Sequence, residues 1–124
     1  MKIVALDYGS ARTGVAASDP TGTVARPVTI VRRVMSDDGF AKLLAVIAAE
    51  DPDLVVIGLP LTLKGEHGKQ ARETAAFVER LRGALGVPVE EFDERFTSVL
   101  AGGDDARAAA HLLSGYLEWR ATSA

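Results

Sequence analysis

Acidic residues that end two apolar segments are the residues of this chain best suited to catalysis. Asp7 closes the apolar run 3–6, Asp93 and Glu94 close the later segment 86–92, and Asp105 stands where the last predicted helix begins. If the two segments are neighbouring strands of a parallel sheet, their carboxyl ends meet at one edge and the carboxylates converge there. Such a group would bind hard cations, and two ions about 4 Å apart would position a water and neutralise a phosphodiester transition state.

Residue types that are rare or absent restrict the metal and the nucleophile. The chain contains no cysteine and only two histidines, His67 and His111. A disulfide framework, a thiolate nucleophile and a thiolate metal site are therefore excluded, and a histidine-rich zinc site is not expected. A site made of carboxylate oxygens favours Mg²⁺ or Mn²⁺ as the cofactor.

Charge and hydropathy restrict the environment and the partners. The formal net charge of −3 at pH 7 provides no overall attraction to nucleic acid, so such a partner would depend on local basic residues and on metal. The first apolar run meets a charge at Asp7 without the apolar core of a secretory signal, and no stretch is long enough to span a bilayer. We therefore expect a cytoplasmic protein with no membrane contact.

Glycines and basic residues follow the predicted strands and could bind a substrate. Gly9 and Gly14 bracket Arg12 in the first loop. The glycines permit tight turns and also permit close approach of a phosphate, which Arg12 is suited to bind. Loop cations are usually only solvated, and Arg95 could form a local ion pair, but these loops leave the proposed active edge. The candidate substrate-binding residues are Gly9, Arg12, Lys64, Lys69, Arg72 and Arg95.

The first third of the chain predicts an antiparallel meander of three strands. Residues 2–7 and 13–19 form apolar, β-branched runs joined by a tight turn, and residues 24–33 follow a second turn at 20–22. Pro27 lacks a backbone donor, which indicates an edge position or a strand start for the third run.

The rest of the chain predicts helices that alternate with strands. Ser36 is suited to cap a helix whose apolar face recurs at helical spacing until Pro52. The continuous apolar run 53–60 is typical of a central parallel strand, followed by a helix over 70–85, a short strand over 86–96 and a helix over about 105–119. The order β-β-β-α-β-α-β-α predicts an α/β fold with a five-stranded mixed sheet and helices packed on it, in one domain over residues 1–124.

Four segments together resemble the YqgF/RuvX family, relatives of the RuvC resolvase. They occur in order over nearly the whole chain and read LDYGSARTGVAASD, VVIGLPLTLKGEHGKQA, PVEEFDERFTS and DARAAAHLLSGYL. The resemblance implies an RNase H-like fold and a nuclease that processes the 5′ end of pre-16S rRNA. By kinship to RuvC it leaves cleavage of Holliday junctions open as the alternative.

The resemblance also implies which acids are functional. The metal-binding positions of the family correspond to Asp7, to Asp93 or Glu94, and to Asp105. Of the adjacent pair we favour Asp93 as the metal ligand, with Glu94 as a further catalytic residue. Asp105 is preferred to Asp104 because the family acid is followed by a helix of small residues with a tyrosine eleven positions on, where Tyr116 stands.

One segment departs from the family pattern. In the family, a longer segment with a basic loop separates the strand that ends in DER from the final aspartate, whereas residues 96–104 alone intervene here. Without that loop, part of the substrate grip would be missing even with the acids intact. This departure keeps open a non-catalytic module that binds RNA or a protein partner.

A phosphotransferase is the other alternative. Actin-like ATPases and sugar kinases also begin with a strand, an aspartate and a glycine turn, but their nucleotide lies between two such domains, and 124 residues supply one. We therefore expect a two-metal nuclease that acts on RNA or branched DNA. It would be a monomer, or a homodimer if it resolves four-way junctions symmetrically.

Overall fold

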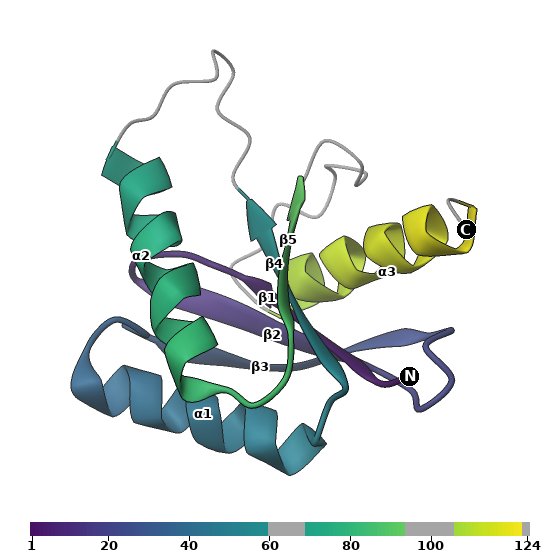
Figure 1. Ribbon diagram of the computed structural model, residues 1–124, viewed down its shortest axis with the longest axis horizontal. Helices are drawn as coiled ribbons and strands as arrows, with labels where there is room; N and C mark the ends of the chain where they lie inside the picture. Colours follow the sequence, from purple (N-terminus) through teal and green to yellow (C-terminus); the bar gives the residue numbers. More distant parts are fainter. Residues whose placement is uncertain (60–68, 94–105, 123–124) are drawn as a thin grey trace.

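The computed structural model describes residues 1–59, 69–93 and 106–122, which form a mixed sheet covered by helices (Figure 1). The elements follow in the order β1 (Ile3–Asp7), β2 (Arg12–Ser18), β3 (Ala25–Arg32), α1 (Asp37–Glu50), β4 (Leu54–Leu59), α2 (Lys69–Ala84), β5 (Val89–Asp93) and α3 (Arg107–Thr122). This is the order that the sequence predicts, and the α/β fold class is confirmed.

The five strands lie in the order β3-β2-β1-β4-β5. β1, β2 and β3 pair antiparallel, whereas β4 runs parallel to β1 and β5 runs parallel to β4. The carboxyl ends of β1, β4 and β5 consequently meet at one edge of the sheet, which is where open α/β sheets bind ligands. Pro27 lies in the edge strand β3, as its missing donor predicts.

Local sequence signals account for the two ends of α1. The Ser36 side chain accepts a hydrogen bond from the backbone N–H of Gly39 at 3.0 Å, which satisfies one of the first N–H groups of the helix. The helix ends at Glu50, and Asp51 follows it in the left-handed conformation with φ 48°. Pro52 then prevents a further helical turn, because it lacks the N–H that the helix would need.

Two apolar clusters lie on opposite faces of the sheet. α1 and α2 cover one face, where Leu43, Phe77 and Leu81 are fully buried against β-strand side chains. α3 covers the other face with Leu113 and Tyr116, and Figure 1 shows it on the side of the sheet away from α1 and α2. Burial on both faces stabilises the fold by about 25 cal/mol per Å² of apolar surface. No helix among the described residues combines the length and the apolar character needed to cross a membrane.

Candidate active site

Asp7 ends β1 at the ligand-binding edge of the sheet and lies between two glycines. In the strand register it is paired with Gly14 of β2 on one side and with Gly58 of β4 on the other. Paired residues direct their side chains to the same face of a sheet, so neither neighbour covers the Asp7 carboxylate with a side chain. Asp7 is half-buried, and the two residues paired with it in the sheet bear no side chain.

Strand alternation determines the face on which Asp7 lies. Ile3 and Ala5 belong to the apolar cluster under α3, whereas Val4 and Leu6 belong to the cluster under α1 and α2. Residues two apart in a strand share a face, so Asp7 lies on the face that α3 covers. Any acid that acts together with Asp7 must therefore reach this face.

The start of α3 lies on the same face, next to the strand residues that are in register with Asp7. Ile30 of β3 is the register partner of Gly14, and Gly14 is the partner of Asp7. Ala106, directly before α3, lines a surface hollow together with Ile30. Asp105, the third predicted acid, precedes Ala106 in the chain and lies outside the described residues.

The second predicted acid position lies at the end of β5. Asp93 is the last residue of this strand and is paired with Leu59 of β4. Because β4 lies between β1 and β5, the backbones of Asp7 and Asp93 are about 10 Å apart at a strand spacing of about 4.8 Å. The side chain of Asp93 and the whole of Glu94 lie outside the described residues.

The loop between β1 and β2 closes tightly at Gly9. Its N–H donates to Thr13 Oγ1 at 3.4 Å, and Thr13 Oγ1 donates to the Gly9 carbonyl at 3.2 Å. A β-carbon at Gly9 would lie 2.4 Å from the carbonyl oxygen of Arg12, so no other residue fits here without a shift of the backbone. The buried Thr13 side chain thus fixes the loop that presents Arg12.

The residue that follows Asp7 attaches the end of β1 to α2. The Tyr8 ring stacks on Phe77 with a centroid distance of 4.7 Å. Burial, and after it the negative charge of Glu73, raise the pKa of Tyr8 above its ordinary value near 10. The neutral ring therefore belongs to the apolar core and helps to hold Asp7 at a fixed position.

The predicted basic residues fall only partly within the described structure. Arg12 is exposed at the start of β2, and Arg72 is exposed near the start of α2. Lys69 begins α2, but its side chain is not described, and Lys64 and Arg95 lie wholly outside the described residues. Arg12 lies two residues along β2 from Gly14, the register partner of Asp7.

A hollow of about 450 Å³ opens over β2 and β3 next to the start of α3, and it is lined by Arg12, Thr29, Ile30, Arg32 and Ala106. Arg12 and Arg32 are register partners in β2 and β3, and both are exposed. Sequence patterns did not single out Arg32. Two adjacent arginines close the third predicted strand, but their relation to Arg12 depends on a register that spacing does not reveal.

Within the described part of the chain, no three acidic or histidine side chains gather into a metal-binding group. Of the predicted ligands, Asp7 alone has a described side chain. Its hard oxygen donors fit a divalent cation such as Mg²⁺ or Mn²⁺. The donor chemistry is thus compatible with the predicted cofactor.

Comparison with known proteins identifies relatives along the chain. The sequence profile of a family described as RuvX, Holliday junction resolvase, matches residues 1–110. A protein of Anaeromyxobacter sp. (strain Fw109-5), named as a proposed pre-16S rRNA nuclease, is 37% identical over 135 aligned positions that cover 97% of this chain and 98% of its own. A protein of the same name from Chloroflexus aggregans is 43% identical over 80% of this chain and 70% of its own. The first alignment has 135 positions, more than the 124 residues of this chain. At some positions this chain therefore has no residue where the relative has one.

Solved structures confirm the fold. The structure of Thermus thermophilus RuvC matches with a TM-score of 0.68 and 13% identity, over 99% of this chain and 97% of its own. T. thermophilus RuvC in complex with a Holliday junction substrate matches with a TM-score of 0.62 and 16% identity, over 98% and 96%. At these identities the likeness shows the fold alone, and this fold is the RNase H-like fold that the sequence predicts.

Proposed function

Because the chain belongs to the RuvX family, we propose that it is a metal-dependent nuclease that processes the 5′ end of pre-16S rRNA in the cytoplasm. The position of Asp7 carries this proposal. It stands at the ligand-binding edge between Gly14 and Gly58, on the face where α3 begins. An acid whose two register partners lack side chains can hold a cation and still admit a phosphate group of the substrate.

Strand alternation favours Glu94 over Asp93 as the acid supplied by β5. Glu90 accepts a hydrogen bond from Tyr116 of α3, and Phe92 contacts the Tyr116 ring edge-on at a centroid distance of 5.2 Å. Glu90 and Phe92 of β5 thus face α3, and Glu94 follows Phe92 by two positions in the sequence. We therefore assign Glu94 as the metal ligand and keep Asp93 as the alternative.

Asp105 is the proposed third ligand. It directly precedes Ala106, which lines the hollow together with Ile30. The proposed set of Asp7, Glu94 and Asp105 consists of carboxylates, and such a set suits Mg²⁺ or Mn²⁺.

The site has two further functions, which are to hold the cation and to admit the substrate. Bound Mg²⁺ or Mn²⁺ supplies a nucleophilic water at neutral pH and neutralises charge on the scissile phosphate. Gly14 and Gly58 leave room for that phosphate beside Asp7, and Arg12 donates to a phosphate oxygen from the same face. In-line loss of the 3′-oxygen leaves a 5′-phosphate and a 3′-hydroxyl.

The test is cleavage of an end-labelled RNA that spans the 5′ end of 16S rRNA, next to a synthetic four-way DNA junction. Each is incubated with Mg²⁺, Mn²⁺ or EDTA. We expect metal-dependent cleavage of the RNA, and we expect Asp7→Asn to lower its rate by about 100-fold or more, which corresponds to the several kcal/mol that metal ligation contributes. Asp38→Asn, an exposed acid at the start of α1, is the matched control.

The description of the family as a Holliday junction resolvase favours one second candidate function. Symmetric resolution requires one active site for each of two strands, and hence a homodimer. Preferential cleavage of the junction by a dimeric protein would establish this function in place of rRNA processing. Binding of either nucleic acid without cleavage, by folded protein with metal present, would instead indicate a non-catalytic module.

A further inference from the structure

We propose that Arg12 and Arg32 together bind a phosphate of the RNA backbone that neighbours the scissile phosphate, a site that rests on the proposed nuclease function. The site is the hollow of about 450 Å³ described above, which we name the arginine hollow. It makes β3, a strand without any of the predicted acids, part of the substrate-binding surface.

The pairing of two like charges across neighbouring strands supports an anionic ligand. Arg12 and Arg32 are direct register partners of antiparallel β2 and β3, which puts their β-carbons about 5 Å apart. A phosphate held between the two guanidinium groups would accept hydrogen bonds from both. Within the described residues, no ion pair engages the Arg32 guanidinium. A phosphate suits the position because guanidinium groups donate paired hydrogen bonds to its oxygens.

The backbone around Arg32 is fixed before any ligand binds. The N–H of the next residue, Arg33, donates to the Ala11 carbonyl at 3.1 Å. The Arg33 carbonyl accepts hydrogen bonds from the N–H of Ser36 at 2.9 Å and from its hydroxyl at 2.7 Å. Arg33 adopts φ 49°, a left-handed conformation that ends β3 at this point. Such preorganisation reduces the conformational entropy that binding has to overcome.

The distance from Asp7 suits a neighbouring phosphate rather than the scissile one. Arg12 lies two residues along β2 from Gly14, the register partner of Asp7, which corresponds to about 7 Å. Arg32 lies one strand further out, at about 4.8 Å from Arg12 in the direction across the sheet. An extended RNA strand with one phosphate beside Asp7 would therefore place an adjacent phosphate over the arginine hollow.

The start of α3 adds positive electrostatic potential to the arginine hollow. The N–H of Ala110 donates to the Ala106 carbonyl at 3.0 Å, so helical hydrogen bonding begins at the wall of the hollow. The positive end of the helix dipole adds to the charge of the two arginines. With a net charge of −3 on the whole chain, this local site provides an attraction to phosphate that the overall charge does not.

The test measures equilibrium binding of fluorescently labelled single-stranded RNA of several sequences, at a series of salt concentrations. Asp7→Asn protein is used throughout to prevent cleavage. The variants are Arg32→Ala, Arg32→Lys and the control Arg26→Ala. Arg26 lies on the same strand β3 and is exposed. It forms an ion pair with Glu50 at 2.6 Å, and it does not line the hollow.

We expect Arg32→Ala to weaken binding about tenfold for every RNA sequence and to reduce the salt slope by about 0.7. Arg32→Lys keeps the charge without the paired hydrogen bonds and should recover part of the affinity. In otherwise wild-type protein, Arg32→Ala should raise KM for RNA more than it lowers kcat.

Binding by Arg32→Ala equal to that of Arg26→Ala would overturn the arginine hollow and leave the nuclease function standing. Failure of the Asp7→Asn protein with native Arg32 to bind any RNA would overturn the proposed function and the hollow with it. Equal binding of single-stranded DNA leaves the phosphate site intact and assigns it to the backbone rather than to RNA.

Discussion

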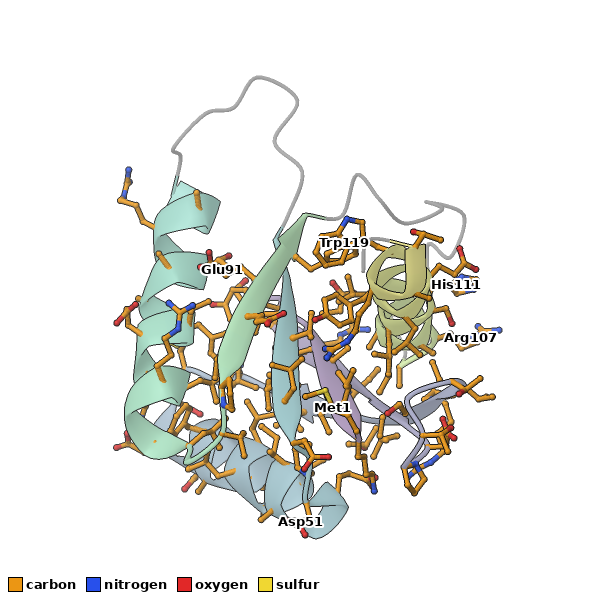
Figure 2. The ribbon with its side chains drawn as sticks, turned by 45° about the vertical axis from the view of Figure 1, so that its right-hand side comes forward. Met1, Asp51, Glu91, Arg107, His111 and Trp119 are labelled. Atoms are coloured by element: carbon orange, nitrogen blue, oxygen red, sulfur yellow. The ribbon has the colours of Figure 1, made fainter. Side chains whose placement is uncertain are left out.

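The Tyr116 hydroxyl donates a hydrogen bond of 2.6 Å to the Glu90 carboxylate and joins α3 to the edge strand β5. α3 begins just after Asp105, and β5 ends just before Glu94. The bond therefore connects the two elements that carry the second and third proposed metal ligands. Figure 2 shows Trp119 on the sheet side of α3, while His111 and Arg107 lie along its outer side.

Tyr116→Phe should lower the free energy of unfolding by about 1 kcal/mol at pH 7, because the hydrogen bond to Glu90 and the longer one from Arg120 are lost. Burial, and after it the bond to Glu90, raise the pKa of Tyr116 above its ordinary value near 10. A raised phenol pKa contributes stability below pH 10 and loses it as pH rises through the folded-state pKa. Urea unfolding at pH 7 and above pH 10 should thus show a difference between the proteins that shrinks in alkali. Equal stability at pH 7 would contradict the prediction.

Gly58→Ala and Gly14→Ala should each reduce kcat for RNA cleavage by about tenfold or more while the fold is retained. The added β-carbon would lie beside Asp7 on the α3 face and occupy the space proposed for the phosphate and its metal. Circular dichroism and thermal unfolding check the fold. Gly86→Ala, where a β-carbon meets nothing within 4 Å, is the matched control and should cleave like the wild type.

Glu94→Gln should reduce cleavage by about 100-fold, and Asp93→Asn by much less, if Glu94 is the metal ligand as we propose. Both substitutions remove one negative charge at adjacent positions, so each is the control for the other. Single-turnover rates in Mn²⁺ give the comparison. A larger loss in Asp93→Asn would return the ligand role to Asp93.

Asp19→Asn should destabilise the protein at neutral pH and have little effect in acid. The Asp19 carboxylate accepts hydrogen bonds from the Thr21 hydroxyl and from the backbone N–H groups of Val24 and Thr23, and these bonds hold its pKa well below the ordinary value near 3.8. A lowered carboxyl pKa contributes stability above pH 4 and loses it as pH falls through the folded-state value. Unfolding midpoints measured from pH 7 down to pH 2 should differ by a constant amount above pH 4 and approach each other below it. A constant difference over the whole range would show that ionisation of Asp19 is not involved.

Gly83→Ala should stabilise the protein by about 0.5–1 kcal/mol, because alanine restricts the unfolded chain and Gly83 lies in α2. A β-carbon at this position meets no other atom within 4 Å. Urea unfolding measures the gain, and cleavage of RNA should be unchanged. A loss of stability would mean that the surroundings of Gly83 are tighter than the structure shows.

Local patterns in the sequence were sufficient to predict the order of the eight elements. The apolar run after Asp53 predicted the central parallel strand β4, Ser36 predicted the start of α1, and Pro27 predicted an edge strand. Each of these signals acts within a few residues of the feature that it determines. Such features can therefore be predicted from neighbouring residues in the sequence.

Relations between strands were not predictable in the same way. Arg12 meets Arg32 because β2 and β3 pair in one register, with an irregularity between Val15 and Ala16 that shifts the pairing by a residue. A shift of this kind changes which side chains share a face, and spacing alone does not reveal it. The choice between Asp93, which the sequence favoured, and Glu94, which we propose, stays a prediction.

β3 has a neighbour on one side only, and it therefore exposes backbone groups that could pair with a strand of another molecule. Pro27 removes one donor from this edge, and Arg32 brings a positive charge to it. Two copies of the chain that approached edge to edge would repel each other. Arg32, which we assign to RNA binding, thus also opposes edge-to-edge association of two copies of the protein. The same edge can attract an anionic nucleic acid and repel a second β3 strand.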